Sequence, residues 1–214
     1  MLRLDEIRRA LSAYEPKLAK PGERRASVAL VLREVSAHGP EILFIERAEK
    51  DGDPWSGHMA FPGGRVAADL ETPEEAAVRE THEEVGLVLP SSARLGRLDD
   101  MEGHHAGRAA GIVISAFVYQ LESAGELVPQ ESEVREAFWV PVLSLVEPER
   151  WVRRPFHGTG SFEFPGIVVG EPDRHVVWGL TYRFLEVFFR AVGRPLPDHW
   201  DAAAVAARER LRGA

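Results

Sequence analysis

The feature that most constrains the fold of this chain is a well-bounded helix signal between Thr72 and Gly86. Thr72 can cap a helix, Pro73 suits the first helical position, and Glu75 completes a Thr-x-x-Glu capping box. Gly86 can adopt the left-handed conformation in which many helices end. The sequence therefore predicts a helix of about four turns that begins near residue 73.

Acidic residues crowd this predicted helix. Residues three and four apart on a helix are neighbours, so Glu80 faces both Glu83 and Glu84, and each like-charge pair costs roughly 0.2–0.5 kcal/mol. A divalent cation among these carboxylates would reverse the sign of the interaction. Arg79, four residues after Glu75 and four before Glu83, could brace those two acids. Two interpretations are open, a solvated acidic face and a metal site.

A glycine-rich loop precedes the helix. Residues 56–64 read Ser-Gly-His-Met-Ala-Phe-Pro-Gly-Gly. Two glycines after a proline let backbone carbonyls approach a ligand closely. The combination of this loop with an acidic helix favours the metal site over the solvated face.

Together these segments resemble the signature of the Nudix hydrolase family. That signature has a Gly, a Glu, then after seven residues Arg-Glu, an apolar residue, any residue, Glu-Glu, any residue, Gly and an apolar residue. Nearly every fixed position is filled in this chain, by Glu71, Arg79, Glu80, Glu83, Glu84, Gly86 and Leu87. Two departures are that Thr81 stands where an apolar residue is usual, and that six residues rather than five separate Gly64 from Glu71.

The longer loop resembles that of the coenzyme A pyrophosphatase branch of the family. Gly57, followed after three residues by Phe-Pro-Gly-Gly at 61–64, is similar to the additional signature of this branch. Residues 177–181, Val-Trp-Gly-Leu-Thr, resemble its C-terminal pattern. The resemblance covers roughly residues 27 to 190.

One position departs from the branch. The branch usually has an Arg four positions before the glycine that matches Gly57, whereas this chain has Asp53, and Arg47 lies nearby but out of register. Coenzyme A or an acyl derivative is the leading substrate that the resemblance implies. The alternatives are another dinucleotide or a nucleotide sugar such as ADP-ribose, and a non-catalytic nucleotide-binding module.

The resemblance implies an α/β fold, the Nudix α/β/α sandwich with a mixed β-sheet between helices. It also implies hydrolysis of a phosphoanhydride bond with Mg²⁺ or Mn²⁺ as cofactor. Metal binding is carried onto Glu80, Glu84 and Glu83, with the backbone carbonyl of Gly64 completing the metal shell. Glu83 is alternatively the acid that orients or deprotonates the attacking water. Arg79 is expected to fix the carboxylates rather than to act on substrate.

Further candidates lie outside this motif. Glu133 could reach back into the site as a general base, and its alternative is a solvated loop acid. The residues expected to contact substrate are Arg47, Trp55, His58, Phe61 and Gly63. His104 and His105 could bind a metal together with acids or contact phosphate, and the alternative is an ordinary loop feature. Arg153 and Arg154, with His157, could form a basic patch, and the alternative is an ordinary surface role.

Length and composition bound the domain organisation. With 214 residues, 44% of them hydrophobic, the chain can bury a core, and we expect one Nudix domain over 26–192. An N-terminal helix and lead-in would occupy 1–25, and a C-terminal helical extension would occupy 193–214. The chain has no cysteine, which removes disulfides, thiolate nucleophiles and Cys-ligated zinc from consideration.

The charge balance bears on partners. Lys and Arg number 26 against 34 acids, a net charge of −8, which disfavours nucleic acid and anionic membranes as partners and leaves a small-molecule nucleotide. No apolar run approaches the roughly 18 residues that cross a bilayer, and the N-terminus reads as an amphipathic helix rather than a signal peptide. We expect a cytoplasmic protein. Homodimers are common in the family, so a homodimer is a further expectation.

Hydrophobic periodicity predicts the remaining elements. Leu4, Ile7 and Leu11 fall at helical spacing, which indicates a short leading helix. Strands are expected at 26–32, 42–45, 93–98, 111–121 and 138–140, and an extended piece at 162–169. A turn or short helix is expected at 144–150, a long helix at 176–192, and a last helix at 201–212.

Overall fold

The computed structural model describes residues 2–20, 24–35, 39–52, 55–67, 70–105, 108–155 and 163–196, with backbone only at 104–105, 108–110 and 154. Its helices are α1 (Leu4–Ser12), α2 (Pro73–Val85) and α3 (Gly179–Ala191). The strands of the larger sheet are β1 (Arg24–Val35), β2 (Gly39–Arg47), β3 (Met59–Ala60), β4 (Gly63–Arg65), β5 (Arg94–Arg97), β6 (Met101–His105), β7 (Arg108–Leu121) and β8 (Val134–Pro141). Those of the smaller sheet are β9 (Trp151–Pro155), β10 (Glu163–Val168) and β11 (Val176–Trp178).

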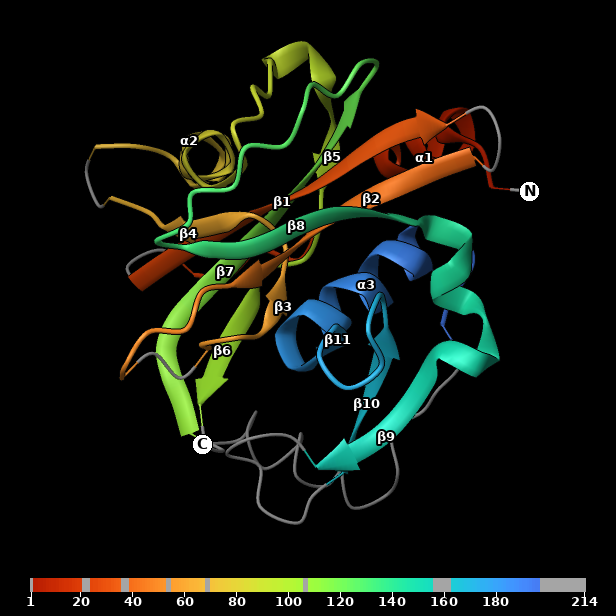
Figure 1. Ribbon diagram of the computed structural model, residues 1–214. Helices are drawn as coiled ribbons and strands as arrows, with labels where there is room; N and C mark the ends of the chain where they lie inside the picture. The colour runs from red at the N-terminus through yellow and green to blue at the C-terminus, as the bar shows by residue number, and fades with distance from the viewer. Residues whose placement is uncertain are drawn as a thin grey trace.

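The larger sheet is mixed. Its strand order is β3-β2-β1-β7-β5, and β1 runs parallel to β7 while the other pairings are antiparallel. Three further strands branch from this path, because β4 pairs with β1, β6 with β7 and β8 with β2. The smaller sheet is antiparallel, in the order β11-β10-β9, and lies beside α3 (Figure 1).

The two faces of the larger sheet are covered by different helices, as Figure 1 shows for α2 and α3. Side chains alternate along a strand, so successive residues of β1 point to opposite faces. Leu30 and Leu32 join the core cluster that contains α1 and α3, whereas Ala29 and Val31 join the cluster under α2. This arrangement of helix, sheet and helix confirms the expected α/β/α architecture.

Helix α2 forms as its sequence predicts. It begins at Pro73, the Thr72 hydroxyl accepts the N–H of Glu75, and the Glu75 side chain accepts the N–H of Thr72. Gly86 ends the helix at φ 74°, in the left-handed region. Thr81 is fully buried and donates its hydroxyl to the carbonyl of Ala77 at 2.7 Å, which satisfies the polar group at a position where an apolar residue is usual.

Several expected elements agree with the structure, and some bounds need correction. The expected helix at 176–192 begins only at Gly179, because 176–178 form β11 against β10. Those residues are Val-Val-Trp, which favour strands. The segment 144–150 forms 3₁₀ turns at Val142–Val146 and Pro148–Arg150. The expected helix at 201–212 lies outside the described residues, and the domain bounds stay predictions.

Other expectations concern single strands. The sequence analysis does not predict strand β9 over 151–155, and the backbones of His104 and His105 belong to strand β6 rather than to a loop. Within the described ranges, no helix is both long and apolar enough to cross a bilayer.

Candidate active site

Three carboxylates from two segments converge beside α2. Glu80 and Glu84 lie one turn apart on the helix, and Glu133 lies just before β8. One carboxylate oxygen from each of these residues lies within 4.8 Å of the others. The sequence-predicted pair on α2 is therefore joined by the later acid, and we call these three residues the acidic cluster.

Glu84 is the most buried member of the acidic cluster, with 2% of its surface exposed. Its carboxylate accepts the backbone N–H of Gly63 at 2.8 Å. Burial raises the pKa of Glu84 to about 8, and the negative charges of Glu80 and Glu133 act in the same direction, while the Gly63 N–H and Arg47 act against them. Around neutral pH, Glu84 therefore holds a proton unless a cation compensates its charge.

The two glycines of the loop let the backbone lie close against the acids and against β1. A Cβ on Gly64 would stand 2.4 Å from the carboxylate of Glu80, and a Cβ on Gly63 would stand 2.1 Å from the carbonyl oxygen of Ser27. Neither position accepts a side chain without displacing these groups. The predicted roles of the Gly64 carbonyl as a metal ligand and of Gly63 as a substrate contact stay predictions.

Arg79 forms a fork that contacts three acids. It donates to both carboxylate oxygens of Glu71, at 2.8 and 3.0 Å, and to Glu80 and Glu83 at 2.9 Å each. These contacts raise the pKa of Arg79, with the hydrogen bonds to Glu71 as the largest cause. Burial raises the pKa of Glu80, and the hydrogen bond from Arg79 opposes that rise. The geometry agrees with an orienting role for Arg79.

The expected bracing of Glu75 by Arg79 needs correction. The Glu75 carboxylate instead accepts the backbone N–H of Thr72 at 2.7 Å, because the capping box holds it at the start of the helix. The partner that the spacing argument missed is Glu71. This residue lies eight positions before Arg79, outside the i,i+4 rule, and only its place in the family signature indicates a role for it.

Glu83 and Glu133 are the two acids expected to act on water. The side chain of Glu83 is 53% exposed and pairs with Arg79. Glu133 belongs to the acidic cluster, and its carboxylate lies 3.6 Å from the ammonium of Lys50. Both roles, and the role of Glu83 as a metal ligand, stay predictions.

The residues that are expected to contact substrate lie in different surroundings. Arg47 ends β2, close enough to lower the pKa of Glu84. The His58 ring makes an edge contact with Trp178, with centroids 4.9 Å apart, and Trp55 is 37% exposed. These three residues stay predicted contacts.

Phe61 is the exception among the expected contacts. Its ring stacks on Phe44 with centroids 5.1 Å apart and belongs to the core, with 2% of its surface exposed. Phe61 therefore packs beneath the loop, and its role as a substrate contact stays a prediction.

The structure describes the remaining candidate residues only in part. Asp53 and His157 lie outside the described residues, and the side chains of His104, His105 and Arg154 are not described.

Sequence reasoning missed a second polar group, formed by Glu46, Glu136 and His175. One ligand-type atom of each lies within 4.8 Å of the others. The three residues come from β2, β8 and the turn before β11, so no local spacing in the sequence signals their meeting. Arg174 also contacts both acids, and this group of four is the Arg174 clamp below.

The acidic cluster fits a divalent cation. Its donors are carboxylate oxygens, which Mg²⁺ and Mn²⁺ prefer. Glu84 is a buried carboxyl whose ionised form is disfavoured by its surroundings, and a cation would stabilise that form. A solvated acidic face explains neither the burial of Glu84 nor the convergence of Glu133.

Comparison with known proteins defines the class. The NUDIX domain family matches residues 23–159, which is more than half of the chain. The chain therefore belongs to the Nudix hydrolase family, in agreement with the motif, the sandwich fold and the acidic helix.

Individual relatives show which members of the family the chain resembles. The chain is 30% identical over 159 residues to the human mitochondrial coenzyme A diphosphatase NUDT8. The aligned region covers 74% of the chain and 66% of that protein. It is 34% identical over 158 residues to an uncharacterized protein of Schizosaccharomyces pombe, covering 65% of the chain and 48% of that protein. The chain thus spans about half of one of these relatives and about two thirds of the other.

A bacterial relative and one solved structure extend over more of the chain. An uncharacterized Nudix hydrolase NudL of Pectobacterium atrosepticum is 27% identical, covering 83% of the chain and 88% of that protein. The crystal structure of a MutT/nudix family protein from Enterococcus faecalis superposes with a TM-score of 0.56 at 17% identity, covering 97% of the chain and 75% of that structure. At this identity the superposition shows the fold alone.

Proposed function

We propose that this protein hydrolyses the phosphoanhydride bond of a nucleoside diphosphate linked to another moiety, with coenzyme A or an acyl derivative as substrate. Water adds to one phosphorus, the bridging P–O bond breaks, and coenzyme A yields 3′,5′-ADP and phosphopantetheine. The observation that carries the proposal is the acidic cluster, in which Glu84 is buried with a pKa of about 8 beside Glu80 and Glu133.

The roles of the residues follow from their placement. Glu80 and Glu84 would hold Mg²⁺ or Mn²⁺, with Glu133 or Glu83 and the Gly64 carbonyl as further donors. When bound, the cation supplies neutralisation of the charge that develops on the diphosphate. Arg79 holds Glu80 and Glu83 in place, and the Gly63 N–H holds Glu84.

Two acids are candidates for orienting the water or accepting its proton. Glu133 lies in the acidic cluster and leaves part of its carboxylate exposed, which suits a group that meets water. Glu83 is engaged by Arg79 on the neighbouring turn. We favour Glu133 as the base and Glu83 as a group that fixes Arg79.

The choice of coenzyme A rests on two supports. The segment before the helix resembles the signature of the coenzyme A branch, and a relative at 30% identity is named a coenzyme A diphosphatase. Asp53, which replaces the Arg of the branch, favours a second candidate, a different dinucleotide or a nucleotide sugar such as ADP-ribose. Oligomeric state and cellular location stay predictions.

A substrate panel tests the proposal. Purified protein is incubated with Mg²⁺ or Mn²⁺ and, separately, coenzyme A, NADH, ADP-ribose and diadenosine polyphosphates, and products are separated by chromatography. We expect 3′,5′-ADP from coenzyme A at the highest kcat/KM. Turnover of ADP-ribose without turnover of coenzyme A would favour the second candidate instead.

The same assay addresses a non-catalytic binding module. Such a module would bind nucleotide in calorimetry and turn over none of the substrates, before and after Glu84→Gln. The enzyme proposal expects turnover in the wild type and its collapse in the variant, with substrate binding partly retained.

A further inference from the structure

The Arg174 clamp contains two acids that face each other and should repel each other. Glu46 on β2 and Glu136 on β8 are direct partners in the antiparallel register. Like charges opposite each other destabilise such a strand pair. Glu46 is also only 2% exposed, so water contributes little to its solvation. Something must compensate this pair for β2 and β8 to stay together here.

Arg174 supplies that compensation with a single guanidinium group. Its Nε donates to Glu46 at 3.0 Å, and its Nη2 donates to Glu136 at 2.9 Å and contacts the second oxygen of Glu46. The hydrogen bonds to Glu46 raise the pKa of Arg174. Arg135 adds a longer contact of 3.5 Å to Glu46. The planar fork of an arginine suits this bridging of two carboxylates.

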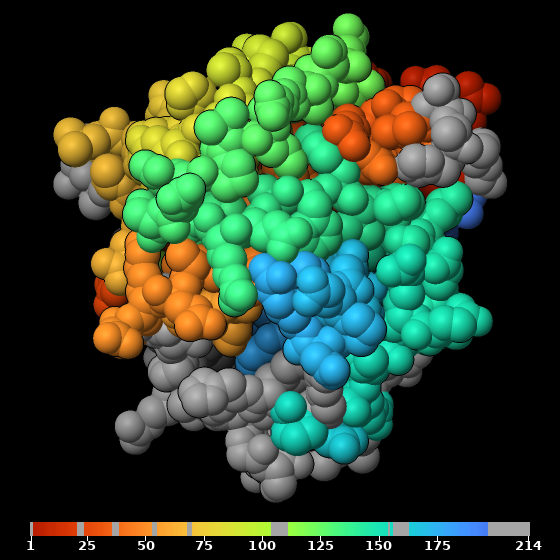
Figure 2. Space-filling view, in the orientation of Figure 1, coloured from red at the N-terminus to blue at the C-terminus, as the bar shows by residue number. Residues whose placement is uncertain are grey.

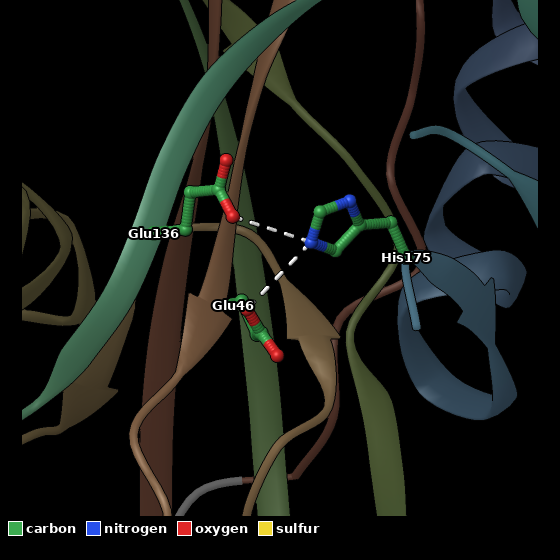
Figure 3. A group of neighbouring side chains, drawn as sticks. All are labelled: Glu46, Glu136 and His175. Carbon is green, nitrogen blue, oxygen red and sulfur yellow. Dashed lines mark ion pairs between the residues drawn. The ribbon is translucent and has the colours of Figure 1, made fainter. Parts of the chain in front are cut away.

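His175, which follows Arg174 in the turn before β11, completes the group. Its Nδ1 accepts the backbone N–H of Glu171 at 3.0 Å, so a neutral ring carries its proton on Nε2. That Nε2 lies 3.4 Å from Glu136 and 3.6 Å from Glu46, and Figure 3 shows it facing both carboxylates. In this tautomer Nε2 has no lone pair for a metal ion. The two acids therefore face an arginine and a ring nitrogen that makes no hydrogen bond within the described residues, and a nitrogen without a lone pair argues against a second metal site.

Packing around His175 fixes the turn that carries Arg174 and His175. A Cβ on Gly170 would stand 2.4 Å from the Nδ1 of His175, so only glycine lets the ring occupy its position, where it is 4% exposed. Its ring also packs against Phe138 of β8, with centroids 4.9 Å apart. In Figure 2 the blue segment before α3 adjoins the green segment that contains β8.

The clamp lies next to an irregularity that leads into the acidic cluster. Directly after the Glu46–Glu136 pair the register shifts, so that Arg47 faces Val134. The backbone of Glu133 then accepts the N–H of Ala48 at 2.8 Å. Beyond this bulge, Arg47 and Glu133 both come close enough to Glu84 to influence it electrostatically. Bulges beside active sites commonly redirect a side chain in this way.

We propose that Arg174, supported by His175, is a positioning residue: it holds β2 and β8 together at the Glu46–Glu136 pair, so that the bulge beyond it carries Glu133 and Arg47 to the acidic cluster. The inference rests on the proposed hydrolase function. It assigns the turn before β11 a part in catalysis without contact to substrate.

The test is Arg174→Gln, measured for turnover of coenzyme A and, independently, for Mn²⁺ binding by calorimetry. We expect kcat and Mn²⁺ affinity each to fall about 10- to 100-fold, with KM changed less, because a supporting contact is lost while substrate contacts remain. The matched control is Arg33→Gln, which removes another partly buried arginine from a carboxylate, Glu41, at the opposite end of β2. The control should keep both properties.

A second substitution separates positioning from other roles. Adding Glu136→Gln to Arg174→Gln removes the repulsion that the clamp balances, and should restore most of kcat and of Mn²⁺ affinity. If Arg174 instead bound a phosphate of the substrate, the double variant would stay impaired. Should Arg174→Gln fail to fold, Arg174→Lys, which keeps the charge without the fork, enters the same comparison with and without Glu136→Gln.

Three results would overturn the inference. They are an Arg174→Gln protein that matches the Arg33→Gln control, a loss that Glu136→Gln does not relieve, and tight Zn²⁺ or Mn²⁺ uptake that disappears in His175→Gln but persists in Glu84→Gln. An inactive wild type would instead contradict the proposed hydrolase function. The two failures therefore give different patterns.

Discussion

The acidic cluster and the Arg174 clamp both bring carboxylates together, and they differ in how much positive charge the chain places beside those carboxylates. In the clamp, two facing carboxylates share one forked arginine, with the Nε2 of His175 3.4 Å from Glu136, so the arginine of the chain supplies the positive charge. In the acidic cluster, Arg79 contacts Glu71, Glu80 and Glu83, and the most buried acid, Glu84, accepts a backbone N–H while the charge of Arg47 acts on it electrostatically. Arg47 and the Lys50 beside Glu133 do not offset the burial of Glu84, whose pKa stays raised to about 8, so the cluster is suited to take up a cation.

The sharpest test of this contrast compares Glu84→Gln with Glu136→Gln. Both keep the shape of the side chain and remove one carboxylate. Glu84→Gln should lower kcat about a thousandfold, since several kcal/mol of transition-state stabilisation depend on the bound cation. Glu136→Gln should lower kcat by less than about threefold, because Arg174 keeps its contacts with Glu46 and no reacting group is touched. Steady-state assays with Mn²⁺ and coenzyme A measure both.

Equal losses in these two variants would remove the distinction between the clusters. Circular dichroism and thermal melts of both proteins serve as the folding control. Binding of Mn²⁺ should weaken in Glu84→Gln and stay unchanged in Glu136→Gln.

A smaller effect is expected where the loop meets the acidic cluster. Gly64→Ala places a methyl group 2.4 Å from the Glu80 carboxylate, so this side chain or the loop must move. A displacement of about 1 Å should lower kcat about 10- to 100-fold. Gly125→Ala is the matched control, because its added methyl group would meet no atom within 4 Å. Full activity of Gly64→Ala would mean that Glu80 is not held where the proposed site needs it.

Arg79→Lys tests whether the shared fork matters as a fork. Lysine keeps the positive charge but cannot contact Glu71 twice while it also contacts Glu80 and Glu83. We expect a loss of about tenfold in kcat with little change in KM, because the acids remain but are held less firmly. Steady-state kinetics on coenzyme A measure it, and a KM that rises at constant kcat would indicate a substrate contact instead.

These comparisons show which parts of the molecule the sequence could predict. Helix α2 was predictable to its first residue, because its cap, its first-position proline and its terminal glycine act within a few residues. The pairing of Glu80 and Glu84 follows from helical spacing. The resemblance to a known family then indicated a cation at this site and pointed to Glu71.

Features that depend on distant contacts were not predictable in the same way. The Arg174 clamp joins residues about 130 positions apart, and no local pattern announces it. The sequence predicts helix over β11 because Val-Val-Trp continues the apolar pattern of α3, and only the pairing of β11 with β10 separates the two elements. Phe61 belongs to the loop motif by sequence, yet its contact with Phe44 places it in the core.

The smallest expected effect concerns stability and again separates the two clusters. The pKa of Glu84 lies near 8 in the folded protein and near 4.5 when unfolded. Its proton therefore contributes stability that is fully present below about pH 4.5 and lost as the pH rises through about 8. Metal-free wild type should lose melting temperature between about pH 6 and 9 more steeply than Glu84→Gln does, whereas Glu136→Gln should follow the wild type.

Added cation should oppose this loss, because it binds the ionised form of Glu84. At about pH 8.5 and a hundredfold excess of Mn²⁺ over its dissociation constant, the wild type should gain about 2.7 kcal/mol, or about 5–10 °C in melting temperature. Glu136→Gln should gain as much and Glu84→Gln much less, as measured by differential scanning fluorimetry with matched Na⁺ controls. If Mn²⁺ stabilised Glu84→Gln as fully as the wild type, the cation would have to bind elsewhere, and the shortage of positive charge around Glu84 would have a different explanation.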